Sequence, residues 1–425
     1  FDTLTIHAGQ QPDGDTHSMC APIYQTTAYE FESAQHAREL FELKAGGNIY
    51  SRIMNPTCDT LERRVAALDG GIGALSMASG HAAIFATMLG LANAGDEIVS
   101  SMNIYGGAIN LLGVTLKNIG INVRFVSADN IEEWENAVTD KTRAFFVEIV
   151  GNPNANVADI EAIAAVAHRH GIPLIADSTF TTPYLCRPIE FGADIVLHSA
   201  TKFLGGHGTS MAGIVVDSGR FKFAGNPRFP QYNEPDVSYH GLVFARDCGN
   251  AGFITRLRVL MLRDLGACLS PFNAFMILQG IETLPLRMQR HCDNALKVAQ
   301  YLSENDAVSF VNYPGLPTSK YYALMQKQMP KGASSVFTFG LKGGREAGVK
   351  FIDSLELISN VANVGDVRSL VIHPATTTHS QLSDEQLRAV DISAETVRLS
   401  IGLEDVSDII SDLDQAIRAA TCGSR

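Results

Sequence analysis

Short apolar runs alternate with helical patterns between residues 70 and 220, and this alternation limits the possible folds more than any other feature of the chain. The apolar runs are, in order, ALSMAS, DEIVSS, NVRFVS, RAFFVEIV, PLIADST, ADIVLHS and AGIVV. Helical patterns fill the gaps between them; the segment 159–171, for example, repeats its apolar residues on one helical face. Strands that alternate with helices build a mostly parallel sheet covered by helices. We therefore predict a large α/β domain around a mostly parallel, seven-stranded sheet.

The pattern changes on either side of this region. After about residue 270, a long helical stretch over 275–305 is followed by the strands SSVFTFGLKG and TVRLSIG and by a helix over 404–420. This order predicts a smaller C-terminal α+β domain. The first 60 residues hold few regular patterns and end in NIYSRIMNPT. We expect an N-terminal arm (1–60) that contributes to a neighbouring subunit, a large domain (61–265) and a C-terminal domain (266–425).

Composition excludes several function classes. The net charge is −12 and no basic block offsets it, which argues against nucleic acid as a partner. The longest apolar stretch, HAAIFATMLGLANA, is shorter than the roughly 18 to 20 residues that a membrane span needs. The opening residues do not resemble a signal peptide. The 7 cysteines are scattered without a C-x-x-C pair, which predicts reduced thiols in a cytoplasmic protein.

Polar residues follow three of the predicted strands, at the sheet edge where α/β proteins bind ligands. Ser79 and Gly80 stand between a strand and a helix, where backbone N–H groups can hold a phosphate. Asp177 closes a nearly apolar strand, where a carboxylate requires a positive partner. The stretch HSATKFLGGHGTS adds hydroxyls and the amine of Lys202. Together the three ends offer an anion cradle, a buried carboxylate and an amine.

This set of groups matches the needs of pyridoxal 5'-phosphate (PLP). The cofactor's phosphate needs N–H and hydroxyl donors, its ring nitrogen needs a carboxylate to stay protonated, and its aldehyde needs a lysine. Eight motifs in order then resemble the Cys/Met-metabolism PLP enzymes of fold type I. They are YSRIMNPT, SGHAA, YGGA, GNPN, ADSTF, HSATKFLGGHG, SLVIHPATTTH and VRLSIG. The resemblance covers nearly the whole chain and implies a fold type I PLP-dependent transferase.

The resemblance implies roles for the residues around the cofactor ring. Lys202 matches the lysine that bonds to the cofactor and later moves protons. Tyr105 matches the catalytic aromatic that stacks on the ring, Asp177 the partner of the ring nitrogen, and Thr179 the hydroxyl beside it. Ser199 and Thr201 match the hydroxyls that bind the phosphate, and Gly80 and His81, which follow Ser79 of the same site, match the pair whose backbone N–H groups complete it. Most relatives have Met or Gln where this chain has His81, but a backbone contact tolerates the change.

Other motif residues are expected to contact the substrate or a second subunit. Arg398 resembles the guanidinium fork that binds the substrate α-carboxylate, a two-point contact that lysine makes poorly. Three more residues match family positions close to the substrate, and these are Asn152, Asn363 and Glu148. Tyr50 and Arg52 resemble a pair that a neighbouring subunit donates to the phosphate. The resemblance thus implies a homo-oligomer, at least a dimer and in this family usually a tetramer built as a dimer of dimers.

Local differences indicate a branch of the family. Gly107 stands where methionine γ-lyases usually have a cysteine, and Ala362 and Asn363 stand where cystathionine γ-lyases carry a glutamate segment. NVGD and PDVSYHG resemble the O-acetylhomoserine sulfhydrylase branch. That branch converts O-acetyl-L-homoserine and sulfide or methanethiol to L-homocysteine or L-methionine and acetate, by γ-replacement in methionine biosynthesis. A methionine γ-lyase or a cystathionine γ-synthase with the same site stays open as an alternative.

Two motifs suggest other chemistry and are weaker. GTSMAG nearly spells the elbow of a serine hydrolase around Ser210, but the elbow needs a strand before the serine and a helix after it. His373 and His379 could suggest a metal site, but their six-residue spacing puts them on no common helical face. We expect no metal.

Overall fold

The computed structural model describes residues 1–377 and 393–421, and its largest element is a seven-stranded sheet. The strand order is β1-β7-β6-β5-β4-β2-β3, and β7 alone runs antiparallel to its neighbours. The strands are β1 (Gly73–Met77), β2 (Glu97–Ser101), β3 (Asn122–Val126), β4 (Thr142–Glu148), β5 (Leu174–Asp177), β6 (Ile195–Ser199) and β7 (Gly213–Asp217). Each predicted apolar run forms one of them, and the predicted fold class is confirmed.

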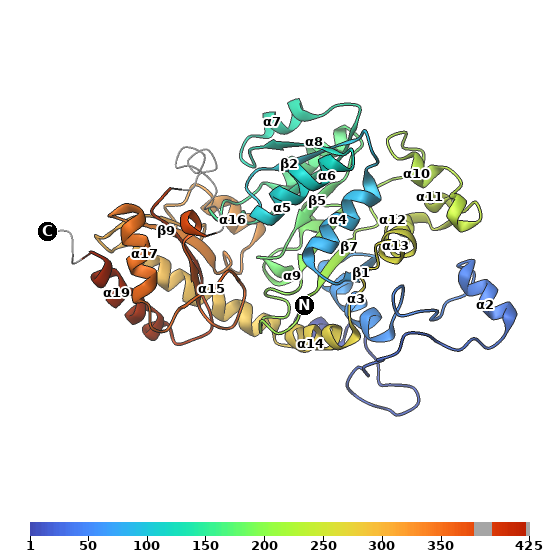
Figure 1. The fold of residues 1–425 in the computed structure, drawn as a ribbon, viewed down its shortest axis with the longest axis horizontal. Coiled ribbons are helices and arrows are strands. Elements are labelled where there is room, and N and C mark those ends of the chain that lie inside the picture. Colours follow the sequence, from blue (N-terminus) through green and yellow to red (C-terminus); the bar gives the residue numbers. More distant parts are fainter. Residues whose placement is uncertain (378–392, 422–425) are drawn as a thin grey trace.

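Helices cover both faces of this sheet, because alternate residues of each buried strand point to opposite sides (Figure 1). In β6, Val196 packs into one hydrophobic core with α3 and α8, whereas Ile195 and Leu197 pack into a second core with α4 and α12. The helices around the sheet are α3 (Pro56–Asp69), α4 (Gly80–Leu91), α5 (Gly106–Asn110), α6 (Leu116–Asn118), α7 (Ile131–Ala137), α8 (Ile160–Arg169), α9 (Thr182–Leu185), α10 (Pro230–Asn233), α11 (Phe244–Asp247), α12 (Gly252–Arg256) and α13 (Arg263–Leu265).

A second, five-stranded sheet lies in the C-terminal part of the chain, in the order β10-β11-β12-β9-β8. Its strands are β8 (Val308–Asn312), β9 (Val336–Leu341), β10 (Ser359–Asn360), β11 (Leu370–Ile372) and β12 (Thr396–Ser400). Its helices are α14 (Pro271–Glu282), α15 (Leu284–Ser303), α16 (Tyr322–Gln328), α17 (Gly344–Ser354) and α19 (Val406–Thr421). The predicted strands and final helix are present, whereas β8, β10 and β11 had no sequence prediction.

The long helical stretch predicted over 275–305 is two helices rather than one. α14 ends at Glu282 and α15 begins at Leu284, with Pro285 in the first turn of α15. A proline has no backbone N–H to continue a preceding helix, but it fits the first turn of a new one. The hydrophobic pattern continues across residues 282–284, but the helical backbone hydrogen bonding is interrupted there.

The N-terminal helix packs on α3 and α14, whereas the segment that follows it is mostly extended and leads away from the rest of the molecule in Figure 1. The two short helices of this region are α1 (Asp2–His7) and α2 (Ala34–Phe41). α3 follows directly: the Asn55 side chain accepts the Thr57 N–H at 3.0 Å and caps the helix, and Pro56 occupies its first position. The division into an arm (1–60), a large domain (61–265) and a C-terminal domain (266–425) stays a prediction.

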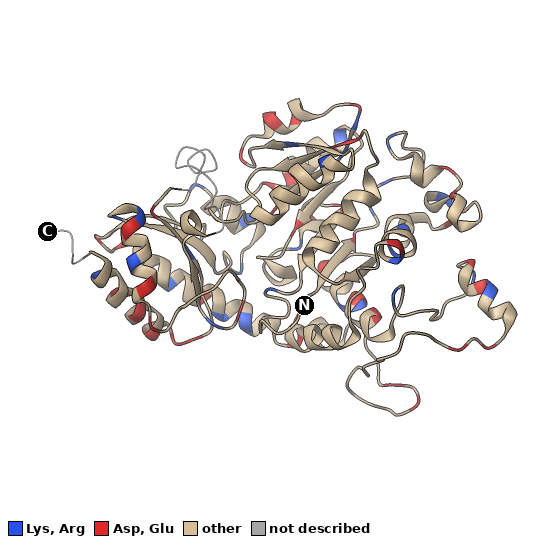
Figure 2. Ribbon diagram, in the orientation of Figure 1, with Lys and Arg blue, Asp and Glu red and all other residues tan. Residues whose placement is uncertain are grey.

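Charged residues of both signs are interspersed along the outer helices (Figure 2). In the described part of the chain, no helix is both long and apolar enough to cross a membrane. The described cysteines, at positions 20, 58, 186, 248, 268 and 292, are free thiols.

A buried histidine in α15 makes the fold sensitive to acid. The Nδ1–H of His291 donates to the Ile401 carbonyl at 2.7 Å, and the imidazole packs edge-on against Phe203 with ring centroids 5.2 Å apart. Burial lowers the pKa of His291 to about 4. In the unfolded chain His291 has an ordinary pKa of about 6.5, so between this value and the folded pKa the unfolded chain binds a proton that the folded chain does not. The free energy of unfolding therefore falls as the pH drops from about 6.5 towards the folded pKa.

We expect acidification from pH 7 to pH 5 to remove about 2 kcal/mol of stability through His291 alone. His291→Gln keeps a donor for Ile401 and cannot be protonated, so this variant should lose about 2 kcal/mol less than the unmodified protein over the same pH step. Urea unfolding at the two pH values measures the difference. Equal acid sensitivity of both proteins would contradict the prediction.

Candidate active site

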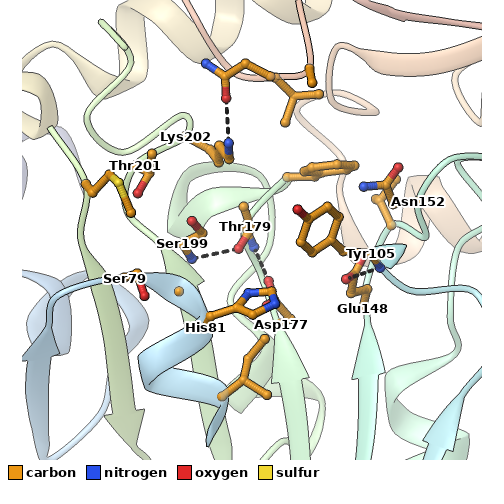
Figure 3. A pocket seen from close by; sticks show the side chains of 18 of the residues that line it. Ser79, His81, Tyr105, Glu148, Asn152, Asp177, Thr179, Ser199, Thr201 and Lys202 are labelled. Atoms are coloured by element: carbon orange, nitrogen blue, oxygen red, sulfur yellow. Dashed lines mark hydrogen bonds between the residues drawn. The ribbon is translucent and has the colours of Figure 1, made fainter. Parts of the chain in front are cut away.

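A cavity of about 340 Å³ opens at the carboxyl ends of the strands of the large sheet, where the C-terminal part of the chain meets it (Figure 3). It gathers 13 of the 15 residues selected from the sequence. They are Ser79, Gly80, His81, Tyr105, Glu148, Asn152, Asp177, Thr179, Ser199, Thr201, Lys202, Asn363 and Arg398. Strands far apart in the sequence therefore deliver these side chains to one place.

The first turn of α4 forms one wall of the cavity. Ser79 caps the helix by accepting the Ala82 N–H at 3.1 Å, which leaves the N–H groups of Gly80 and His81 without an intrahelical acceptor. A Cβ at position 80 would lie 2.7 Å from the Ser199 Cβ, so only glycine lets the helix approach the end of β6 this closely. Free N–H groups at a helix start are suited to an anion such as a phosphate.

The end of β6 supplies hydroxyl groups beside this helix start. The Ser199 N–H donates to Thr179 Oγ1 at 2.8 Å, whereas the Ser199 hydroxyl has no hydrogen-bond partner within the described residues. The Thr201 hydroxyl already donates to the Ala212 carbonyl at 3.2 Å and accepts the Ala212 N–H at 3.0 Å. Ser199 is therefore the hydroxyl with a donor to spare for a ligand.

Two buried carboxyl groups stand next to each other at the ends of β4 and β5. Glu148 and Asp177 are register partners, and the Thr179 N–H donates to Asp177 Oδ1 at 2.9 Å. Burial raises the pKa of Asp177, and burial together with the Asp177 charge raises the pKa of Glu148 well above its usual range. A cationic ligand relieves such a pair, since a buried carboxylate is costly without a positive partner. A protonated pyridine nitrogen fits this requirement.

The amine of Lys202 lies across the cavity from these carboxyl groups. Its Nζ donates to Asn363 Oδ1 at 2.5 Å. Burial lowers the pKa of Lys202, and the nearby charge of Arg398 lowers it further. A lysine that gives up its proton more readily is a better nucleophile and base, as bonding to an aldehyde requires.

Tyr105 presents its ring at the mouth of the cavity. It precedes α5, and its N–H donates to Glu148 Oε1 at 2.7 Å, so the carboxyl group fixes the turn that carries the ring. Tyr105 is 48% exposed, and its ring meets His81 edge-on, with centroids 5.6 Å apart. A Cβ at Gly107 would lie 2.6 Å from Tyr105 Cε1, so glycine there leaves the ring its position. An exposed aromatic face of this kind can stack on a flat ligand.

Arg398 extends from β12 into the cavity and has no carboxylate partner among the described residues. Its Nη1 donates to Asn152 Oδ1 at 3.1 Å and its Nη2 to the Asn363 carbonyl at 3.4 Å. Burial lowers its pKa to about 10. A buried guanidinium held only by neutral oxygens is suited to bind a carboxylate through two hydrogen bonds.

Tyr50 and Arg52 are the two selected residues that do not line this cavity. The Arg52 Nη1 donates to the Arg263 carbonyl at 2.5 Å, and its guanidinium lies 5.5 Å from the centre of the Tyr50 ring. Within one chain, the structure does not bring them to the other 13 residues.

Several apolar residues of the cavity wall had no sequence prediction. They are Ile84, Val150, Phe180, Met211 and Val364. Apolar side chains in strands and helices look like core residues in a sequence, and nothing in their spacing distinguishes a cavity wall from a packed interior. For Val364, the one available signal was its position next to Ala362 and Asn363, which the sequence analysis had compared with the family pattern.

Comparison with known proteins identifies the family. A family model described as Cys/Met metabolism PLP-dependent enzyme matches residues 2–418. The chain belongs to this family. It is therefore a PLP-dependent enzyme, and the residues described above fit that cofactor's phosphate, ring nitrogen and aldehyde. The predicted family, enzyme class and cofactor are confirmed.

Relatives within the family are similar over almost their whole length. The chain is 50% identical to an O-acetyl-L-homoserine sulfhydrylase from Leptospira meyeri, over 98% of this chain and 96% of the relative. It is 51% identical to O-acetyl-L-homoserine sulfhydrylase 1 from Thermus thermophilus, over 98% and 99%. A crystal structure of a Campylobacter jejuni protein, named as a candidate O-acetylhomoserine (thiol)-lyase, superposes with a TM-score of 0.95 at 42% identity, over 98% and 99% of the two chains. That structure contains a pyridoxyl-lysine phosphate.

The two weaker motifs stand as follows. Ser210 lies between the glycine loop and β7, with a strand rather than a helix after it, so it lacks the geometry of a hydrolase elbow. His379 lies outside the described residues. Within residues 1–377 and 393–421, no group of three or more His, Cys, Asp or Glu side chains is placed to hold a metal ion.

Proposed function

We propose that this enzyme catalyses γ-replacement, converting O-acetyl-L-homoserine and sulfide or methanethiol to L-homocysteine or L-methionine and acetate. The observation that carries the proposal is one cavity with a Lys202 of lowered pKa, a buried Asp177 and an Arg398 that has no carboxylate partner in the described part of the chain. The names of the relatives at about 50% identity support the choice of reaction within the family.

The residues that would hold the cofactor follow from the geometry. The α4 start and Ser199 would bind its phosphate, Asp177 would keep its ring nitrogen protonated, Thr179 would orient Asp177, and Tyr105 would stack on the ring. Lys202 would bond to its aldehyde. When bound, PLP supplies an electron sink that stabilises negative charge on the substrate's carbon atoms. Asp177 supports that sink, because its carboxylate favours the protonated ring.

The substrate's own groups meet the remaining side chains. The Arg398 fork would bind the α-carboxylate, and Asn152, which already accepts from Nη1, would fix the direction of the fork. The Lys202 amine, released from the aldehyde by the substrate's amine, would remove and return protons at Cα and Cβ. Its lowered pKa matches this task, since a base works best with a pKa near the working pH. Acetate would leave from Cγ, and the sulfur nucleophile would bond to that carbon in its place.

A comparison of substrates tests the reaction. Purified enzyme with O-acetyl-L-homoserine and sulfide should release homocysteine and acetate, and methanethiol in place of sulfide should give methionine. Methionine alone should yield no α-keto acid. Production of an α-keto acid from methionine, without any replacement product from the ester, would instead establish a γ-lyase, and the same assay with cysteine tests the cystathionine γ-synthase alternative.

Arg398→Lys is expected to raise the KM for O-acetyl-L-homoserine about ten- to a hundredfold, because one of two charge-assisted hydrogen bonds to the carboxylate is lost. The visible absorbance of the bound cofactor should not change, since Arg398 is assigned to the substrate. Arg290→Lys, at an exposed position outside the cavity, is the matched control. A KM within twofold of the unmodified enzyme would remove Arg398 from the substrate site.

We also infer a shared site in a cytoplasmic homo-oligomer, at least a dimer and, as is usual in this family, a tetramer built as a dimer of dimers. Tyr50 and Arg52 match the family's phosphate-binding pair but lie outside their own chain's cavity. The arm also exposes large apolar side chains, which a second copy would cover: Met19, Ile23, Tyr24, Phe41 and Tyr50. The free thiols of the described cysteines suit a reducing compartment.

Mixed dimers test the shared site. Arg52→Ala and Lys202→Ala should each be nearly inactive, but a one-to-one mixture should recover about a quarter of the native activity, since half of the dimers are mixed and each has one intact site. Lys202→Ala mixed with Asp177→Asn is the control, because both changes fall in the same chain's cavity and no intact site can form. A mixture no more active than its parents would show that Arg52 serves its own chain.

A further inference from the structure

One backbone carbonyl of the turn that carries Tyr50 and Arg52 is hydrogen-bonded to the body of the same chain. The N–H groups of Ile53 and Met54 donate to the Tyr50 carbonyl at 2.9 and 3.1 Å and close the turn. The Ile53 carbonyl then accepts a hydrogen bond from Arg258 Nη1 at 3.0 Å. Arg258 belongs to η5 (Leu257–Leu262), a π-helical segment between α12 and α13 that packs on α4.

Arg258 is itself held by buried groups of the large domain. Its Nη2 pairs with Glu62 Oε2 of α3 and donates to the Ala74 carbonyl of β1 at 3.3 Å. The other Glu62 oxygen accepts the Ser76 N–H at 2.9 Å and the Ser76 hydroxyl at 2.7 Å. Glu62 is almost fully buried, so this ion pair has little freedom to rearrange. The sheet thus fixes Glu62, Glu62 fixes Arg258, and Arg258 fixes the turn.

The start of α13, directly after η5, supplies a second contact with the turn. Arg263 is the first residue of α13. The Arg263 carbonyl accepts the Arg52 Nη1 at 2.5 Å. Arg258 therefore holds the turn through its backbone, and the Arg263 carbonyl holds it through one nitrogen of the Arg52 guanidinium.

We propose that Arg258 is a positioning residue for the active site of a second copy of this chain, and not for the site in its own chain. By fixing the Ile53 carbonyl, it sets the place from which Tyr50 and Arg52 reach the neighbour's cofactor phosphate. This inference rests on the shared site proposed above. Arg258 does not line the cavity of its own chain, so its substitution is expected to affect cofactor binding only through the arm.

Two substitutions of Arg258 distinguish the loss of its contact with Ile53 from a general loss of stability. Arg258→Ala removes both contacts and leaves Glu62 buried without its cation, which also costs stability. Arg258→Lys keeps a positive charge for Glu62 but has no planar fork with which to reach Ile53 as well. If Arg258 positions the turn, hydrogen exchange at the Ile53 and Met54 amides of the cofactor-free Arg258→Lys protein should be faster, with the β1 amides unchanged.

Cofactor affinity is the main measurement. PLP titrated into each cofactor-free homo-oligomer and followed by its visible absorbance should bind about ten- to a hundredfold more weakly to Arg258→Ala and Arg258→Lys than to the unmodified protein. Arg228→Ala is the matched control, since Arg228 Nη1 also bonds to backbone carbonyls, those of Thr139, Asp140 and Thr142, but far from the arm. Its affinity should stay unchanged. Unchanged affinity in both Arg258 variants would overturn the inference.

Mixed dimers decide which subunit is affected. In dimers of Arg258→Ala with Lys202→Ala, the single lysine-bearing site faces an intact arm, so its affinity should return to near the native value. In dimers of the unmodified chain with the double variant Lys202→Ala/Arg258→Ala, the lysine-bearing site faces a loosened arm and should stay weak. Weak binding that follows the lysine-bearing subunit would overturn the proposal. If Arg52→Ala and Lys202→Ala fail to complement each other, the shared site itself fails, which is a separate result.

Discussion

Lys202→Ala is expected to lower turnover by at least about a thousandfold and to remove the covalent link between protein and cofactor. Removal of a positioned general base costs roughly 10²- to 10⁴-fold by itself, and here the same amine also provides the attachment point. Lys202 is the one lysine among the described lining residues, so no other amine of the cavity can replace it.

A mass measurement checks the covalent link independently of turnover. After borohydride reduction, the unmodified protein should gain the mass of the reduced cofactor on a peptide that contains Lys202, and the variant should gain none. Lys222→Ala, an exposed lysine on the same domain, is the matched control and should behave like the unmodified protein. Reduced cofactor on any other lysine, or full turnover by Lys202→Ala, would contradict the assignment.

The sequence predicted the position of the site well because strand ends are local features. An apolar run that stops at Asp177 or Ser199 marks the strand's carboxyl end, and parallel strands bring such ends to one edge of the sheet. The family motifs then connected Arg398, on the other sheet, to the same cavity. Neither step required knowledge of packing, which is why both could be made from the chain alone.

Packing decides the features that the sequence did not predict. The pairing of Glu148 with Asp177 depends on the register of β4 against β5, and no local pattern reveals that register. The tie between Arg258 and Ile53 joins residues 205 positions apart. The strands β8, β10 and β11 are short or half-exposed, so their apolar pattern is weak. Each is a product of tertiary contacts rather than of local propensity.

The Glu148–Asp177 pair also changes how the site is expected to titrate. Burial raises the pKa of both groups and the Asp177 charge raises the pKa of Glu148 further, so without a cation the pair favours holding a proton. A protonated pyridine nitrogen reverses this for Asp177, because an opposite charge at contact favours the ionised carboxylate. The Tyr105 N–H on Glu148 favours the charged form of that group, but burial outweighs it. Asp177 is thus the group that the cofactor's charge would select.

Asp177→Asn is expected to lower kcat by at least about a hundredfold, because the amide cannot keep the ring nitrogen protonated and the electron sink weakens. Glu148→Gln is the matched control: the amide oxygen can still accept the Tyr105 N–H, and the Asp177 carboxyl group stays in place. This variant should change kcat far less. The absorbance of the bound cofactor, followed against pH, should shift in Asp177→Asn and stay close to native in Glu148→Gln.

The comparison of the two variants distinguishes charge from shape. Both replace a buried carboxyl group by an amide of equal size on adjacent strands, so a purely structural effect would be similar in both. A large loss confined to Asp177→Asn assigns the charge requirement to one position of the pair. Equal losses in both variants would indicate a purely structural effect, and a larger loss in Glu148→Gln would mean that the cation binds to that carboxylate instead of Asp177.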